Sequence, residues 1–112
     1  MFLSKNHGKV TVLQFSQEQK NLTMTIIEKI KTELLQFIDS NKYIILNLDG
    51  IQYIDSSGIG SLVTVYHHSV EKGHIFALCG LNKKTYDLVK ITKLDTVFSI
   101  YPDTTSFINK YN

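Results

Sequence analysis

The centre of the chain joins a buried-strand pattern to a helical pattern through a short polar segment. Residues 43–48 form an almost uninterrupted apolar run of the length expected for a buried strand. After this run, apolar residues recur at the spacing of one helical face: Ile59, Leu62, Val63, Tyr66 and Val70. A strand followed by a helix is the building block of α/β folds, so this stretch favours a mostly parallel sheet.

The rest of the chain extends the same alternation. Thr25 and Glu28 fit a capping box at the start of the first helix, and Ile27, Ile30 and Leu34 begin its apolar stripe. The patterns predict, in chain order, strands over 1–5 and 9–15, a helix over 24–39, a strand over 74–79, a helix after Asn82, a strand over 97–101 and a helix after Pro102. We therefore predict one α/β domain over residues 1–112, with a mixed, mostly parallel sheet, an N-terminal antiparallel hairpin and about four helices.

The polar segment between the central strand and helix contains an acid, two hydroxyls and two glycines. Asp55 or Ser56 is a natural N-cap, because either side chain can accept a hydrogen bond from a free amide of the first turn. The helix N-terminus carries about half a positive charge, so an anion is stabilised there. Gly58 and Gly60 remove side-chain bulk, which allows another backbone or a partner to approach closely.

These residues carry a family resemblance. Residues 54–60, Ile-Asp-Ser-Ser-Gly-Ile-Gly, resemble the central motif of STAS domains, in particular the bacterial anti-sigma factor antagonists. Residues 43–48 look like the family's strand before the motif, 86–95 like its third helix and the following turn, and 97–101 like its last strand. The resemblance implies a STAS-like fold from about Lys42 to the end of the chain.

The resemblance also implies a function. In the antagonists, the first hydroxyl after the Asp is phosphorylated by an anti-sigma factor that is a histidine-kinase-like ATPase and a serine kinase; here that residue is Ser56. The unphosphorylated protein binds the anti-sigma factor and frees a sigma factor, phosphorylation releases it, and a serine phosphatase restores it. The protein is then a substrate and switch rather than an enzyme, and it needs no cofactor.

The resemblance assigns roles to the other motif residues as well. Asp55 would orient the loop, Ser57 and Gly58 would shape the first turn, Gly60 would let the helix sit close, and Ile59 belongs to the same partner-binding segment. One segment departs from the family. The antagonists often carry a Gly-Glu-Leu-Asp-like sequence after the second strand, whereas the loop 16–21 contains no glycine. This departure leaves the identity of the partner open.

Composition excludes several other classes of function. The formal charge is +2 and the chain contains no arginine, which argues against nucleic-acid binding. No apolar run is long enough to cross a membrane, no secretory signal opens the chain, and Cys79 is its only cysteine, so we expect a cytoplasmic protein. The adjacent His67 and His68 point about 100° apart on a helix and do not form a metal-chelating pair.

Three alternatives stay open. Ser56 is a plain N-cap in the simplest interpretation of the motif. In a second alternative, the same surface binds one partner permanently, and the chain is a non-phosphorylated STAS subunit of a lipid-transport or stress-signalling complex. A small serine hydrolase is a further alternative, based on Ser56 or Ser57 with nearby Asp55, although the Gly-x-Ser-x-Gly nucleophile motif is absent.

Overall fold

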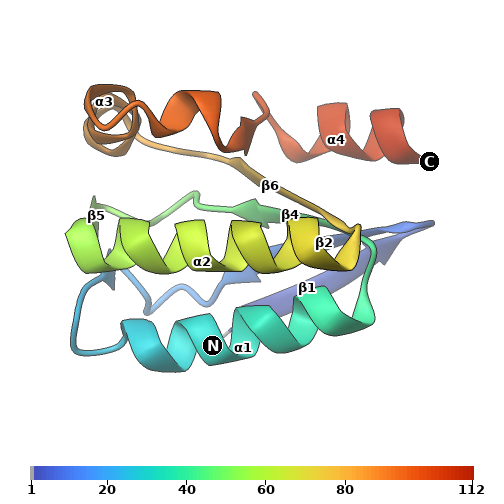
Figure 1. Cartoon of the computed structure of the whole chain (residues 1–112), viewed down its shortest axis with the longest axis horizontal. Coiled ribbons are helices and arrows are strands. Elements are labelled where there is room, and N and C mark those ends of the chain that lie inside the picture. The colour runs from blue at the N-terminus through green and yellow to red at the C-terminus, as the bar shows by residue number, and fades with distance from the viewer. Residues whose placement is uncertain (1) are drawn as a thin grey trace.

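The computed structural model of the protein describes residues 2–112 (Figure 1). Its elements are β1 Phe2–His7, β2 Val10–Phe15, β3 Asn21–Leu22, α1 Ile27–Ser40, β4 Tyr43–Asn47, β5 Tyr53–Ile54, α2 Ser56–Lys72, β6 Ile75–Cys79, α3 Lys83–Ile91, a 3-10 turn Leu94–Thr96, β7 Ser99–Ile100 and α4 Thr104–Tyr111. The predicted α/β class and the number of α-helices are confirmed.

Five strands form the main sheet in the order β1–β2–β4–β6–β7. β1 and β2 are antiparallel, with His7 opposite Val10, and the turn between them uses Gly8 at a φ of 64°. All other neighbours in this sheet are parallel. The mixed sheet with an N-terminal hairpin is therefore as predicted; Met1, which the predicted first strand included, lies outside the described residues.

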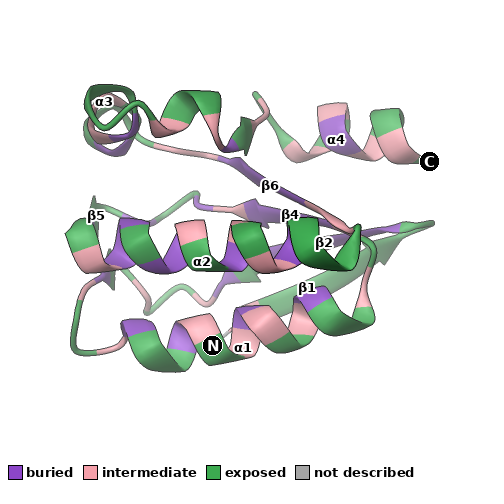
Figure 2. Ribbon diagram, in the orientation of Figure 1, coloured by how far each residue is buried: buried purple, intermediate pink, exposed green. Residues whose placement is uncertain are grey.

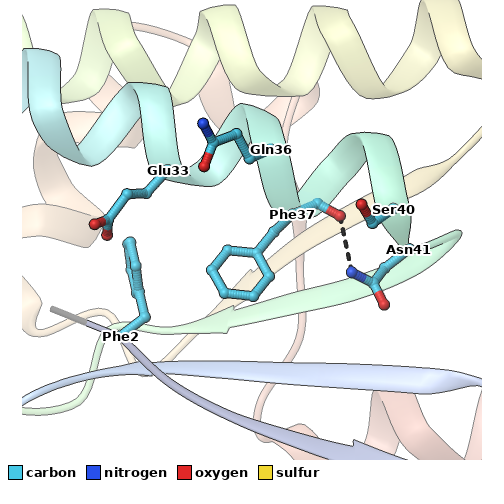
Figure 3. A pocket seen from close by; sticks show the side chains of 6 residues that line it. All are labelled: Phe2, Glu33, Gln36, Phe37, Ser40 and Asn41. Atoms are coloured by element: carbon cyan, nitrogen blue, oxygen red, sulfur yellow. Dashed lines mark hydrogen bonds between the residues drawn. The ribbon is translucent and has the colours of Figure 1, made fainter.

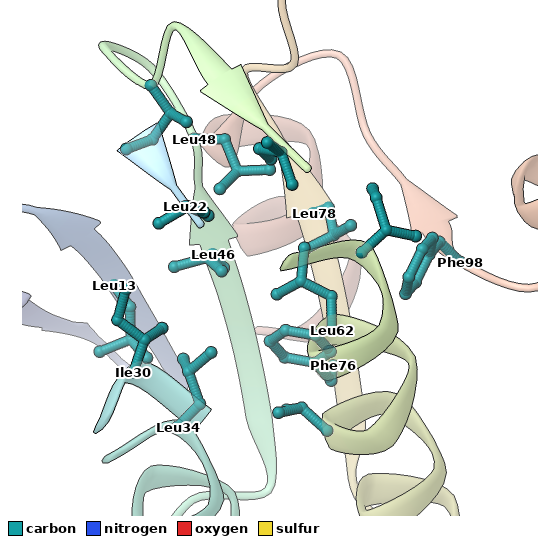
Figure 4. Close-up of a cluster of buried hydrophobic side chains, with 14 of the residues drawn as sticks. Leu13, Leu22, Ile30, Leu34, Leu46, Leu48, Leu62, Phe76, Leu78 and Phe98 are labelled. Atoms are coloured by element: carbon teal, nitrogen blue, oxygen red, sulfur yellow. The ribbon is translucent and has the colours of Figure 1, made fainter. Parts of the chain in front are cut away.

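Helices cover both faces of the sheet. On one face, α1 and α2 pack over the apolar side chains of the central strands (Figure 4). The stripe predicted for α1 is confirmed, because Ile27, Ile30, Leu34 and Ile38 are all buried there. On the other face, a smaller cluster forms around Phe107 of α4. Figure 2 shows that each helix carries both buried and exposed residues.

Local capping signals set most helix ends. Asp55, Asn82 and Asp103 are the N-caps of α2, α3 and α4, and each side chain accepts a hydrogen bond from the amide three residues further on. Gly73 ends α2 in the left-handed conformation at a φ of 71°. Asp55 was one of the two N-cap candidates in the sequence, and α3 starts directly after Asn82 as predicted.

Other local predictions were wrong. α1 begins at Ile27, its N-cap Ile26 makes no side-chain bond, and the Thr25 hydroxyl lies 3.2 Å from that of Thr23. The capping box does not form, because a turn at residues 24–26 precedes the helix. Val70 is 55% exposed, since the second half of α2 presents other residues to the sheet. The last strand keeps only Ser99–Ile100, because the amides of Val97 and Phe98 bond to the carbonyl oxygen of Leu94 in the preceding 3-10 turn.

Two short strands that the sequence did not predict place the polar segment in the fold. β3 and β5 pair in parallel as a separate two-stranded sheet, with Leu22 opposite Ile54. Both of these side chains are buried in the larger core. This pairing fixes the backbone immediately before α2 against a segment more than 30 residues earlier in the chain.

Candidate functional site

The motif lies where β5 ends and α2 begins. Asp55 is the N-cap and Ser56 is the first residue of the helix. Figure 1 shows the first turn of α2 at the same end of the molecule as β5 and α3. In parallel sheets, loops at the carboxyl ends of the strands commonly hold functional residues, and β4 and β6 both finish toward this end.

The Asp55 side chain accepts three hydrogen bonds, from two segments of the chain. Its Oδ1 accepts hydrogen bonds from the Ser57 hydroxyl at 2.5 Å and from the Gly58 amide at 2.9 Å, and its Oδ2 accepts one from the Met24 amide at 3.3 Å. The hydrogen bond from the Ser57 hydroxyl lowers the pKa of the Asp55 carboxyl, and the bond from the Gly58 amide adds a smaller effect in the same direction. The carboxylate is therefore ionised at neutral pH and fixes the first turn of α2 to the segment after β3.

The two serines of the motif have different surroundings. Ser57 is half-buried and its hydroxyl is engaged by Asp55. Ser56 is exposed and lines a hollow of about 340 Å³. The hollow is bordered by residues from β5, α2 and α3: Gln52, Tyr53, Ile54, Asp55, Ser56, Lys84, Thr85 and Leu88. Of the two serines, Ser56 is the more exposed, and the hydroxyl of Ser57 is the one bonded to Asp55.

The two glycines of the motif also differ. A β-carbon at Gly58 would lie 2.6 Å from the Leu22 carbonyl oxygen and 2.6 Å from Cγ2 of Ile54, so only glycine fits without a shift of the backbone. Gly60 is exposed, and a β-carbon there would meet no other atom within 4 Å. The prediction that Gly60 lets the helix sit close is therefore wrong for contacts within the chain. Gly58 is the glycine at which the helix packs closely against another segment. Ile59, between them, is buried.

Sequence patterns did not place α3 beside the motif. Asn82 donates hydrogen bonds from Nδ2 to the carbonyl oxygens of Ile51 at 3.3 Å and Gln52 at 3.0 Å, which fixes the start of α3 next to the chain leading into β5. As a result, Lys84 borders the same hollow as Ser56. The capping role of Asn82 was visible in the sequence, but nothing in the sequence indicated these two carbonyl partners.

Exposed apolar side chains flank the motif. The Met24 side chain is 75% exposed, and Tyr53 in β5 is 53% exposed. Both lie beside Asp55: the backbone amide of Met24 donates a hydrogen bond to the Asp55 carboxylate, and Tyr53 precedes Asp55 by two residues. They are two of the six large apolar residues that are exposed in the described chain, and these two lie next to the motif.

The other hollows and the histidines lie apart from this site. A larger hollow, of about 470 Å³, opens between Phe2 of β1 and α1, where Asn41 Nδ2 donates to the Phe37 carbonyl at 3.0 Å (Figure 3). His68 is not simply solvated, because its Nε2 lies 2.7 Å from Asp39 Oδ1 and connects α2 to α1. Cys79 is buried, which raises the pKa of its thiol to about 11.

Two further properties concern residues 2–112 as a whole. They contain no group of three or more histidine, cysteine or carboxylate side chains placed to hold a metal ion. None of the helices in this part of the chain combines the length and the apolar character needed to cross a bilayer.

Comparison with known proteins gives consistent results. The family model of the STAS domain matches residues 3–106. An anti-sigma F factor antagonist from Paenibacillus polymyxa is 27% identical over 97 residues, which are 87% of this chain and 82% of that protein. An anti-sigma-factor antagonist (STAS) domain protein from Planctomyces limnophilus has a TM-score of 0.84 at 22% identity, covering 97% of this chain and 95% of the other. The Bacillus cell fate determinant SpoIIAA in its phosphorylated form has a TM-score of 0.72 at 15% identity, over 100% of both chains.

Proposed function

The chain belongs to the STAS domain family, and on that premise we propose that it is an anti-sigma factor antagonist switched by phosphorylation of Ser56. In its unphosphorylated form it binds an anti-sigma factor that is also a serine kinase, and this releases a sigma factor. The phosphorylated form lets the anti-sigma factor go, and a serine phosphatase restores binding. All of these steps belong in the cytoplasm, where sigma factors act.

The observation that carries this proposal is the contrast between the two serines. The Ser56 hydroxyl is exposed at the first position of α2 and borders a hollow, whereas the Ser57 hydroxyl is held by Asp55. A kinase needs a hydroxyl that it can reach. Ser56 Oγ would attack the γ-phosphorus of ATP, the bond from that phosphorus to ADP would break, and the hydroxyl proton would pass to a base of the kinase.

The position of Ser56 suits a phosphate. Phosphorylation adds about −1.5 to −2 charges and strong acceptor oxygens. The amides and the dipole of a helix N-terminus favour such a charge, so α2 can accept it without rearrangement. The structural relative SpoIIAA exists in both an unphosphorylated and a phosphorylated form, with the same fold as this chain.

Release of the partner follows from electrostatics. We expect the partner to cover Ser56 together with the exposed side chains of Met24 and Tyr53. Like charges brought together in an interface cost several kcal/mol. Because about 1.4 kcal/mol is a tenfold change in affinity, one phosphate is enough to dissociate the complex.

The test is to incubate the protein with the cognate anti-sigma kinase and ATP and to map the modified residue by mass spectrometry. We expect phosphate on Ser56 in the wild type and in Ser57→Ala. Ser56→Ala should stay bound to the kinase in the presence of ATP, and Ser56→Asp should bind at least tenfold more weakly than the wild type. Phosphate found only on Ser57 would remove Ser56 from the mechanism.

The same experiment separates the alternatives. Tight binding to a partner with no phosphate on any serine would favour a constant subunit of a lipid-transport or stress-signalling complex. No observation favours the hydrolase. The residues that border the hollow around Ser56 include no histidine, and the Asp55 carboxylate accepts a hydrogen bond from the Ser57 hydroxyl. Turnover of an ester substrate that is lost in Ser56→Ala would revive it.

A further inference from the structure

The hollow beside Ser56 contains one side chain of each charge. Asp55 is the anion, and its carboxylate is ionised and turned toward the first turn of α2. Lys84 is the cation, contributed by the first turn of α3. A phosphate on Ser56 would share the hollow with both charges, so Asp55 would repel it and Lys84 would attract it.

Two neighbouring lysines begin α3, and they differ in their partners. Lys83 Nζ lies 3.1 Å from Asp87 Oδ2, one turn further along the helix. Lys84 is exposed and has no carboxylate partner among residues 2–112. Its ammonium group is therefore available to an incoming anion, whereas that of Lys83 is already engaged.

The backbone at Lys84 is held in place although its side chain is exposed to water. Asn82 binds the carbonyl oxygens of Ile51 and Gln52 through Nδ2 and caps α3 by accepting the Thr85 amide at 2.9 Å. Thr85, the next residue after Lys84, is buried. The flexible four-carbon stem of the lysine therefore starts from a constant position at the edge of the hollow.

We propose that Lys84 forms an ion pair with the phosphate on Ser56, so that the phosphorylated protein holds the phosphate between the first turns of α2 and α3. This inference rests on the proposed function of Ser56. The chain contains no arginine, so no guanidinium can make the bidentate contact that usually holds phosphate. A lysine acts instead as a point charge, and it offsets the repulsion between the phosphate and Asp55.

An ion pair of this kind has a measurable consequence. The second ionisation of a phosphoserine has a pKa of about 6, and a nearby positive charge favours the dianion and lowers that value. Removing Lys84 should therefore raise the pKa of the phosphate by about 0.5 at low ionic strength. The difference should disappear near 1 M salt, where the Debye length is about 3 Å.

The experiment uses the full chain with phosphoserine inserted at position 56 during translation, and it follows the phosphorus NMR shift as a function of pH. The variant is Lys84→Gln, and the matched control is Lys83→Gln, which removes the same charge one residue away. We expect a raised phosphate pKa in the first and a value close to the wild type in the second. Lys84→Arg should keep the value low.

Two results would overturn the proposal: a phosphate pKa unchanged in Lys84→Gln, or equal increases in both glutamine variants, which would indicate only a general positive field. Circular dichroism confirms that each variant is folded before the titration. The phosphate is installed without a kinase, so the titration reports on Lys84 whether or not the kinase modifies Ser56. A response to Lys84→Gln without modification by the kinase would overturn the proposed function alone.

Discussion

The first turn of α2 has an inner and an outer side with opposite properties. On the inner side, Ser57 and Gly58 are held by the Asp55 carboxylate, and Gly58 lies against the backbone of Leu22. On the outer side, Ser56 and Gly60 are exposed, and a β-carbon at Gly60 would meet nothing within 4 Å outside its own helix. Residues four apart share one face of a helix, so Ser56 and Gly60 lie on the same exposed face of α2.

This difference separates the two tasks of the motif. The inner side joins α2 to the β3–β5 pair and thereby fixes the orientation of the helix. The outer side is left free, and its glycine places no side chain one turn beyond the Ser56 hydroxyl. Residues adjacent in sequence can thus serve the fold and the proposed binding surface, because successive helical residues point about 100° apart.

Alanine at Gly58 should produce the largest change in stability. Its β-carbon would overlap the Leu22 carbonyl oxygen and Ile54, and overpacking of this kind costs about 1–3 kcal/mol, of which the better helix propensity of alanine recovers up to about 1. We expect Gly58→Ala to lower the urea midpoint. A midpoint equal to that of the wild type would mean that β3 moves aside easily and that the inner side is not tightly packed.

The same substitution at Gly60 should have the opposite sign. The new β-carbon meets open space, and alanine is favoured over glycine inside a helix by up to about 1 kcal/mol, so Gly60→Ala should raise the melting temperature. A lowered melting temperature would contradict the open environment that we describe.

A bulkier side chain at Gly60 tests the outer side as a binding surface. Gly60→Val should fold normally but bind the proposed anti-sigma partner about tenfold more weakly, since its side chain would project toward the surface over Ser56 that we expect the partner to cover. Titration of the partner by calorimetry measures this loss. Wild-type affinity in Gly60→Val would place the partner elsewhere.

The smallest effect concerns acid stability. The pKa of Asp55 is lowered in the folded protein by the Ser57 hydroxyl and the Gly58 amide, so the unfolded chain binds more protons below about pH 5. The contribution of the Asp55 carboxylate to the free energy of unfolding is present at neutral pH. It is lost as the pH falls below the ordinary Asp pKa of 3.8 and through the lower pKa of the folded state. Asn also caps helices but does not titrate. Asp55→Asn should therefore be less stable than the wild type at pH 7, and the difference in stability between the two proteins should become smaller as the pH falls.

Urea midpoints of the wild type and of Asp55→Asn, measured between pH 7 and pH 3, give this difference in stability. Asp103, the N-cap of α4, provides the control outside the motif, because its pKa is also lowered by the amide and hydroxyl of Ser106. Asp103→Asn should show the same dependence on pH but leave binding of the partner unchanged. A gap at Asp55 that stays constant with pH would show that its carboxylate is not the stabilising form.

The sequence by itself determined what depends on near neighbours. Strand and helix periodicity, the caps at Asp55, Asn82 and Asp103, and the end of α2 at Gly73 are each set by residues within a few positions of one another. Such signals need no distant contacts, because a cap satisfies amides of its own first turn. The unformed capping box at Thr25 and Glu28 shows that the fold does not use every one of them. The resemblance of the motif to STAS domains was visible at the same level.

Only the tertiary structure decided which motif residues face inward and what stands opposite them. β3 and β5 have two residues each and show no periodicity, yet their pairing puts the Leu22 carbonyl against Gly58 and distinguishes that glycine from Gly60. Lys84 reaches the hollow beside Ser56 because Asn82 binds carbonyl groups about 30 residues earlier in the chain. Contacts over such separations depend on how whole elements pack, and no local pattern of side chains encodes them.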